Sequence, residues 1–207
     1  MKLVTSEDMT ITDVNCEYYG LSRLQLMENA GRAVAEEVKK RFIDGEIVVI
    51  AGTGNNGGDG FVAARFLKEH EVRVVLLGRG RDIRSDIAKR NYEILKLCGV
   101  EILEILDSED VRNLEELECK VIIDAMLGTG FKGEPRQPFA AAIDAINSSD
   151  AFVVAVDVPS GLNPDTGKYV KAVKANVTVT FHAAKPGLLK APDISGEIVV
   201  ADIGIPE

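Results

Sequence analysis

Residues 46–60 read EIVVIAGTGNNGGDG, an apolar run that passes directly into a stretch with five glycines in nine residues. The continuous β-branched run at 46–51 is typical of a strand that is covered on both faces of a parallel sheet. The glycines permit positive φ angles and a close approach of the backbone to a ligand. A helix that begins after them would direct free N–H groups at that ligand. The stretch therefore predicts a strand–loop–helix unit that binds an anion such as phosphate.

Apolar runs of the same kind recur along the chain. We predict further strands over 72–77, 101–105, 121–125, 152–156, 177–181 and 198–201, of which 101–105 has the weakest pattern. Apolar positions three or four residues apart predict helices over 24–38, 60–69, 86–97 and 138–146. This alternation predicts an α/β fold: a Rossmann-like, doubly wound, mainly parallel sheet with helices on both faces. We expect one domain over residues 1–207, with residues 1–42 as a helical extension packed on the sheet.

The composition excludes several classes of protein. The 207 residues carry a net charge of -9, and 46% are hydrophobic and 28% charged, which is typical of a globular domain. An acidic chain is a poor partner for nucleic acid, since phosphate binding needs a basic face. No apolar run approaches the roughly 20 residues of a membrane span, and the N-terminus lacks the apolar segment of a signal peptide. Cys16, Cys98 and Cys119 are widely separated and form no C-x-x-C pair, so we expect a reducing, cytoplasmic compartment.

Polar side chains stand at the ends of three predicted strands, where open parallel sheets bind their ligands. Asn56 follows the first of these strands, Asp124 ends the second, and Asp157 and Ser160 follow the third. If the strands are parallel, the four side chains converge at one edge of the sheet. They form an all-oxygen set with few carboxylates, which suits a weakly charged hard cation better than zinc. A buried, hydrogen-bonded Asp124 without any ligand is the structural alternative.

The glycine-rich stretch leaves a second alternative open. Residues 52–57 satisfy the G-x-G-x-x-G fingerprint of dinucleotide-binding proteins, which is weak by itself. The fingerprint expects an acidic residue about 20 positions later, but the second predicted strand ends near Arg79 and Arg81. An NADP-dependent oxidoreductase therefore remains possible. Asp59 could simply cap the helix that follows the glycines.

Five motifs in order resemble the NAD(P)H-hydrate epimerases, the YjeF N-terminal domain family. They are LMENAG at 26–31, GNNGGDG at 54–60, DAMLGTG at 124–130, DVPSG at 157–161 and TFHAAKPG at 180–187. The resemblance covers nearly the whole chain. It implies an isomerase that interconverts the R and S forms of hydrated NADH and NADPH, in which water has added at C6 of the reduced nicotinamide ring. It also implies a partner dehydratase that uses ATP or ADP and consumes only the S form, and a homodimer formed through N-terminal helices.

The resemblance also assigns residues. By the family pattern, the substrate would be held by Asn55, Asn56, Gly57, Gly58, Asp59, Gly128, Thr129, Gly130, Phe131, Lys132, Gly133, Glu134 and Asp157. A potassium ion would be ligated by Asn56, Asp124 and Ser160.

A mechanism follows as a hypothesis. The ring nitrogen can expel the C6 hydroxyl, and water can return from the other face. We expect Asp157 to supply the acid–base catalysis, with Lys132 setting its charge and position. The same domain serves as a non-catalytic scaffold in an mRNA-decapping enhancer, so a scaffold is the alternative from another class.

Overall fold

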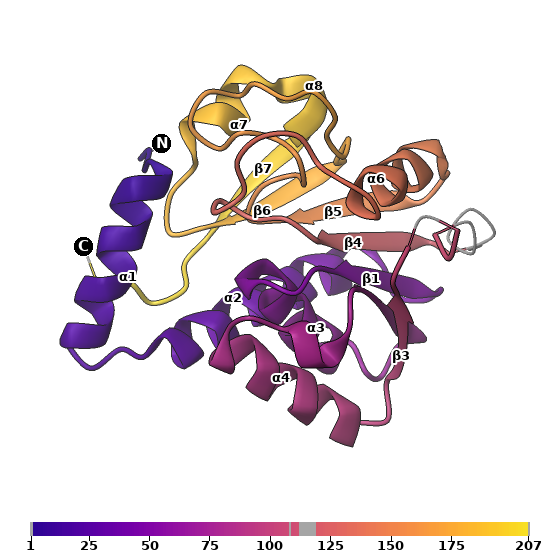
Figure 1. Ribbon diagram of the computed structural model, residues 1–207. Coiled ribbons are helices and arrows are strands. Elements are labelled where there is room, and N and C mark those ends of the chain that lie inside the picture. Colours follow the sequence, from indigo (N-terminus) through magenta and orange to yellow (C-terminus); the bar gives the residue numbers. More distant parts are fainter. Residues whose placement is uncertain (1, 108, 112–118, 207) are drawn as a thin grey trace.

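The computed structural model describes residues 2–107, 109–111 and 119–206 (Figure 1). Within these ranges the strands are β1 (Ile47–Ala51), β2 (Val72–Leu77), β3 (Glu101–Ile105), β4 (Val121–Ala125), β5 (Phe152–Val156), β6 (Val177–Phe181) and β7 (Glu197–Ala201). They form one seven-stranded sheet in the order β3-β2-β1-β4-β5-β6-β7. Every neighbouring pair is parallel. The predicted Rossmann-like sheet is therefore confirmed, including its weakest strand.

The strand order reverses between β1 and β4, and this point positions the site. β1 pairs with both β2 and β4, and Ala51 at its end lies opposite Ala125 at the end of β4. Asp124 in turn lies opposite Ala155 of β5. The carboxyl ends of β1, β4 and β5 therefore meet at one edge of the sheet, as the sequence predicted. Ligands of open α/β sheets bind outside such an edge.

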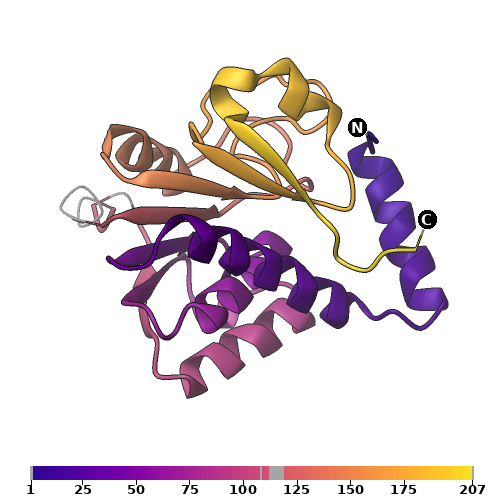
Figure 2. The same cartoon turned by 180° about the vertical axis from the view of Figure 1, so that it is seen from behind.

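Helices cover both faces of the sheet (Figures 1 and 2). On one face lie α2 (Arg23–Arg41), α3 (Asn55–Phe66) and α4 (Asp86–Leu97), and on the other lies α6 (Phe139–Ser148). Alternate β1 residues serve the two cores: Val49 packs toward α2, α3 and α4, and Val48 packs toward α6. Three shorter elements lie between these: η1 (Gly80–Asp82) before α4, and α7 (Pro186–Lys190) and α8 (Pro192–Ser195) before β7. None of the helices in the described ranges is long and apolar enough to cross a membrane.

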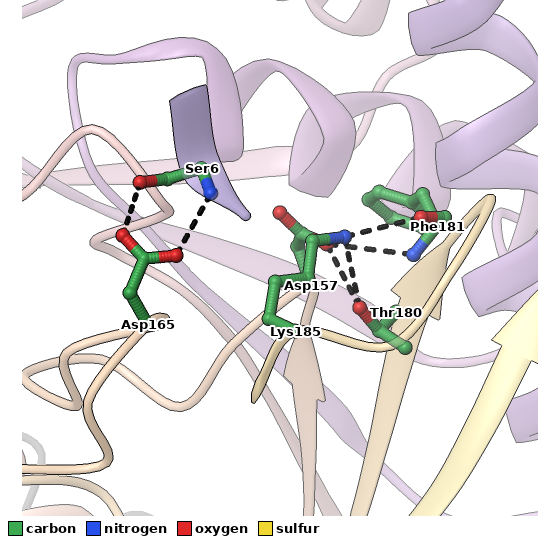
Figure 3. A network of polar contacts seen from close by, with 6 residues as sticks. All are labelled: Ser6, Asp157, Asp165, Thr180, Phe181 and Lys185. Carbon is green, nitrogen blue, oxygen red and sulfur yellow. Dashed lines mark hydrogen bonds and ion pairs between the residues drawn. The ribbon is translucent and has the colours of Figure 1, made fainter. Parts of the chain in front are cut away.

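The first helix, α1 (Ser6–Tyr18), stands apart from both helical layers. We expected residues 1–42 to pack on the sheet, and α2 does so, whereas α1 lies beside the carboxyl ends of the strands (Figures 1 and 2). The backbone N and Oγ of Ser6 donate hydrogen bonds to the two carboxylate oxygens of Asp165, at 2.8 and 2.5 Å (Figure 3). The inner side of α1 carries its two buried residues, Met9 and Cys16. These contacts fix α1 as a wall opposite the strand ends.

The glycine-rich stretch is built differently from what the sequence predicted. Helix α3 already begins at Asn55, and no glycine between 52 and 60 has a positive φ. Instead, these glycines allow close packing. A Cβ on Gly60 would lie 2.5 Å from the Cβ of Ala125. A Cβ on Gly52 would collide with the carbonyl oxygen of Met126, beyond the end of β4. The absence of side chains therefore brings the start of α3 directly against the sheet edge.

Candidate functional site

A cavity of about 1600 Å³ opens at the carboxyl ends of the strands. Its walls come from α1, from the segments that follow β1, β4 and β5, and from the start of α3. Most of the residues that we predicted to hold a ligand line it: Asn55, Asn56, Asp59, Gly128, Thr129, Gly130, Phe131, Lys132, Gly133, Glu134 and Asp157. The structure thus gathers side chains that are up to about half the chain apart in sequence.

Gly57 and Gly58 are not among the residues that line this cavity, and our expectation that both contact the ligand stays a prediction. Both lie inside α3 and are buried. A Cβ on Gly58 would lie 2.6 Å from Cε of Met27, and one on Gly57 would collide with the carbonyl oxygen of Gly52. Their role in this structure is close packing of α3, which leaves the cavity wall to Asn55, Asn56 and Asp59.

Asp157 is held by one of its two carboxylate oxygens (Figure 3). Its Oδ1 accepts hydrogen bonds from Nζ of Lys185 at 2.5 Å, Oγ1 of Thr180 at 3.1 Å and the backbone N of Phe181 at 3.4 Å. Its Oδ2 accepts none from the described residues. The backbone of Asp157 has a φ of 64°, a conformation that a residue other than glycine adopts at a cost. The strand end therefore fixes the carboxylate and leaves one oxygen available in the cavity.

Lys185 is the cation that pairs with Asp157, and the sequence did not identify it. Its side chain is fully buried and also donates to Oγ1 of Thr180 at 3.0 Å and to the carbonyl oxygen of Phe181 at 3.1 Å. We expected Lys132 to set the charge and position of Asp157. Lys132 is exposed at the cavity and makes no ion pair with Asp157 in the described structure. Lys185 lay within the motif at 180–187, and its place in an otherwise uncharged stretch was the signal.

Glu7 of α1 lines the cavity but is exposed, whereas two further carboxyl groups that face the cavity are half-buried: Asp59 from α3 and Asp13 from α1. Neither side chain makes a hydrogen bond or an ion pair with the part of the chain that the structure describes. Burial raises the pKa of Asp59 well above its usual value, and the charges of Asp157 and Asp13 raise it further. Burial also raises the pKa of Asp13, against the lowering effect of Arg23. Asp59 is the fifth residue of α3, so the alternative that it caps this helix is wrong.

Asp124 and Ser160 form a buried pair beneath the cavity, and neither lines it. The carboxylate of Asp124 accepts hydrogen bonds from Oγ of Ser160 at 2.5 Å, from its backbone N at 2.8 Å and from the backbone N of Met126 at 3.3 Å. Burial raises the pKa of Asp124 to about 6, although these hydrogen bonds oppose the shift. Oγ of Ser160 also accepts from the backbone N of Leu127 at 2.8 Å. The pair therefore joins the segments that follow β4 and β5.

Asn56 lies next to the segment that follows β4. A Cβ built on Gly128 of that segment would be 3.1 Å from the Cβ of Asn56. Its side chain is buried, and Nδ2 has no hydrogen-bond partner. A buried N–H donor without a partner calls for an acceptor such as ordered water or a ligand oxygen, whereas a cation would be bound by the amide oxygen Oδ1. Together, Asp124, Ser160 and Asn56 supply one carboxylate, one hydroxyl and one amide. In the described ranges, no group of three or more His, Cys, Asp or Glu side chains is placed to hold a metal ion. This donor chemistry fits a monovalent cation.

Basic side chains complete the cavity wall: Arg23, Arg84, Lys132 and Arg136. The backbone N of Arg84 donates to the carbonyl oxygen of Thr53 at 3.0 Å, which places Arg84 beside the start of α3. Arg79 and Arg81, which had suggested an NADP-dependent oxidoreductase, do not line the cavity. The cavity therefore combines several basic side chains with a cluster of carboxyl groups.

The parallel seven-stranded sheet defines the chain as a Rossmann-like α/β protein, and its cavity lies at the topological switch point, where such folds bind ligands. The family described as "YjeF-related protein N-terminus" matches residues 23–187. The chain belongs to this family.

Named relatives agree with this assignment. The chain is 54% identical over 207 residues to the "Bifunctional NAD(P)H-hydrate repair enzyme Nnr" of Archaeoglobus fulgidus, and this match covers all of the chain but 42% of that protein. It is 40% identical over 194 residues to the "NAD(P)H-hydrate epimerase" of Nitrosopumilus maritimus, covering 90% of the chain and 88% of that protein. The chain thus spans about two fifths of the bifunctional relative. The crystal structure of yeast ynu0 (YNL200c) matches with a TM-score of 0.82 and 29% identity, covering 92% of this chain and 84% of that one.

Proposed function

We propose that the chain is an isomerase that interconverts the R and S forms of hydrated NADH and NADPH. The observation that carries this proposal is the carboxylate of Asp157, which is anchored through Oδ1 and leaves Oδ2 available in a cavity of about 1600 Å³. Such a cavity exceeds the roughly 300–1,000 Å³ of ordinary small-molecule pockets and can accept a dinucleotide. The names of the relatives support the same activity.

The chemistry needs little beyond acid–base catalysis. C6 of the hydrated ring carries both the ring nitrogen and the hydroxyl. The nitrogen lone pair can expel the hydroxyl as water once a proton reaches it, which leaves a planar C6=N1 iminium. Water that adds to the other face and loses a proton gives the opposite epimer. A carboxyl group that transfers these protons contributes roughly 10²–10⁴-fold. We assign such a role to Asp157, with its Oδ1 held by Lys185.

The remaining predicted residues would hold the nucleotide. The N-terminus of α3 at Asn55 has no side-chain cap, so its backbone N–H groups can bind a phosphate. Arg84, Lys132 and Arg136 add positive charge at the same cavity. The segment 128–134 would close against the nucleotide, since each of its residues lines the cavity. The expected catalytic role of Lys132 remains a prediction.

We also propose that potassium binds at Asn56, Asp124 and Ser160. The oxygen donors that these residues carry, an amide oxygen, a hydroxyl and a single carboxylate, support this ion, because a set of low charge suits a monovalent cation. Its positive charge would offset the cost of the buried carboxylate and brace the segments that follow β1, β4 and β5.

The proposal extends to partners and compartment. A dehydratase that uses ATP or ADP would consume the S form, in keeping with the bifunctional name of the relatives. A homodimer through α1 is supported by its exposed apolar side chains, Ile11, Val14 and Tyr18. The net charge of -9 opposes nucleic acid as a partner. The cysteines Cys16, Cys98 and Cys119 are free, which suits a reducing cytoplasm.

A coupled assay tests the activity. The chain is added to an epimer mixture of hydrated NADPH, with an S-specific dehydratase and ATP in excess, and the absorbance of reduced nicotinamide is followed. We expect complete conversion at a rate set by the added chain. Conversion that stops at the S fraction and then continues only at the spontaneous rate would contradict the proposal and favour a scaffold. A change of absorbance without the dehydratase would favour an oxidoreductase.

A further inference from the structure

Inversion at C6 places a demand on the site that one carboxyl group does not meet. The hydroxyl leaves from one face of the planar iminium, and water enters at the other face. A carboxyl group fixed on one wall of the cavity reaches only one of these faces. Asp157 is fixed in this way, because its Oδ1 is held by Lys185, Thr180 and Phe181. The epimerisation therefore calls for a second proton-transfer group on the opposite wall.

Asp13 is the half-buried one of the two carboxyl groups that α1 contributes to the cavity, the other being the exposed Glu7. Asp157 follows β5, whereas α1 stands beside the ends of the strands in both views (Figures 1 and 2). Both residues line the same cavity. α1 is tied down before Asp13 by the hydrogen bonds of Ser6 to Asp165, and after it by an ion pair of Glu17 with Arg23 at 3.2 Å. The helix is thus held at both ends with Asp13 between them.

The side chain of Asp13 is free to act on a ligand. It is half-buried and accepts no hydrogen bond from the described residues. The charged groups that face it are Arg23 from α2, Asp59 from α3, Asp157 after β5 and Lys185 before α7. Burial and the charge of Asp157 raise its pKa, against Arg23 and Lys185. A carboxyl group in these surroundings keeps its proton to a higher pH than usual, as a general acid must.

We propose, on the basis of the proposed epimerase function, that Asp13 and Asp157 transfer protons on opposite faces of the nicotinamide ring. In one direction, protonated Asp13 donates its proton to the C6 hydroxyl, the C6–O bond breaks, and N1 supplies the electron pair that forms the iminium. Water then forms a new C–O bond on the other face and gives its proton to Asp157. The proton has moved from Asp13 to Asp157, and exchange with solvent returns the pair to its first state. The reverse reaction uses the two groups in exchanged roles.

Asp59 is a further half-buried carboxyl group of the cavity, but it comes from helix α3, which is proposed to bind the nucleotide. It lies three residues after Asn56 on that helix, and its backbone carbonyl oxygen is the atom that a Cβ on Gly31 of α2 would meet at 2.5 Å. From α1 both Glu7 and Asp13 reach the cavity, but Glu7 is exposed whereas Asp13 is half-buried, so Asp13 is the α1 carboxyl group that is shielded from bulk water. Asp13 and Asp59 can be told apart by experiment. Only removal of the carboxyl group that transfers a proton on the face opposite Asp157 should abolish the pH dependence of turnover.

The variant Asp13→Asn tests the proposal, with the coupled assay of R-epimer loss as the readout. We expect kcat to fall roughly 10²-fold with little change in KM, since the amide binds but cannot transfer a proton. The parent rate should decline as the pH rises through the raised pKa of Asp13, and this decline should vanish in the variant. Asp13→Glu should restore part of kcat and retain the decline. Asp8→Asn, on the same helix but exposed and outside the cavity, is the matched control and should behave as the parent.

The outcomes separate the possible failures. If the parent chain itself gives no acceleration, the proposed function fails before Asp13 is tested. If the parent is active and Asp13→Asn keeps the parental kcat, the assignment of Asp13 is wrong. The assignment is equally wrong if Asp13→Asn slows turnover but retains the decline at high pH while Asp59→Asn removes it. If Asp13→Asn does not fold, the activity of Asp13→Glu is the test. Partial activity that retains the decline at high pH supports the proposal. A folded Asp13→Glu variant that binds substrate normally but is fully inactive contradicts it.

Discussion

Replacing Lys185 by methionine should destabilise the chain strongly, because it leaves a charge without its partner. The ammonium of Lys185 is fully buried, and the Asp157 side chain is 13% exposed. Breaking a buried ion pair by removing one partner costs about 3–5 kcal/mol. In a domain of this size each kcal/mol lowers Tm by roughly 2–4 °C, so the variant should melt roughly 6–20 °C below the parent. The hydrogen bonds from Thr180 and Phe181 keep the effect from being larger.

Urea unfolding and thermal melting measure this cost. The double variant Lys185→Met with Asp157→Asn should recover a part of the lost stability, since no buried charge remains. Lys168→Met, at an exposed site, is the control and should stay within about 0.5 kcal/mol of the parent. A Lys185→Met variant as stable as the parent at every pH would refute the account of the buried pair.

Three further predictions concern packing, charge and the ion. Gly60→Ala should cost about 1–3 kcal/mol in urea unfolding, because its Cβ would lie 2.5 Å from that of Ala125, whereas Gly54→Ala, which meets no atom within 4 Å, should change little. Because the pKa of Asp59 is raised in the folded state, the folding stability that this group contributes is present at acidic pH and is lost as the pH rises through its folded-state pKa. Asp59→Asn should therefore have a higher Tm than the parent at high pH but not at low pH. Equal pH profiles of Tm for the two proteins would contradict this. Replacing sodium by potassium should raise Tm of the parent but not of Asp124→Asn, and equal shifts in both would remove the proposed ion from that site.

The sequence predicted the sheet well because each strand is a continuous apolar run that needs burial on both faces. The short helices α7 and α8 were missed, since each begins with a proline and is too short to show a period. The start of α3 was placed too late because its glycines were interpreted as a loop. Those glycines are required by close contacts with distant segments, such as Gly52 with Met126, which no local pattern reveals.

The candidate site was predicted in its strand-end residues and missed in its long-range partners. Asp124, Asp157 and Ser160 stood out because polar groups interrupt or follow apolar strands. The pairing of Lys185 with Asp157 spans 28 residues, and a lysine in a sequence gives no sign of which carboxylate it meets. Asp13 was overlooked because the N-terminal helix was treated as packing alone, and only the path of α1 past the strand ends brings it to the cavity.

The rate of R-epimer loss in the coupled assay, compared between the parent and Asp157→Asn, tests the central claim most directly. Asp144→Asn, an exposed aspartate that pairs with Lys171, is the control and should match the parent. The account predicts that Asp157→Asn still binds the hydrated dinucleotide but accelerates its epimerisation by a factor roughly 10²–10⁴ smaller. An Asp157→Asn variant that epimerises at the parental rate would contradict the account.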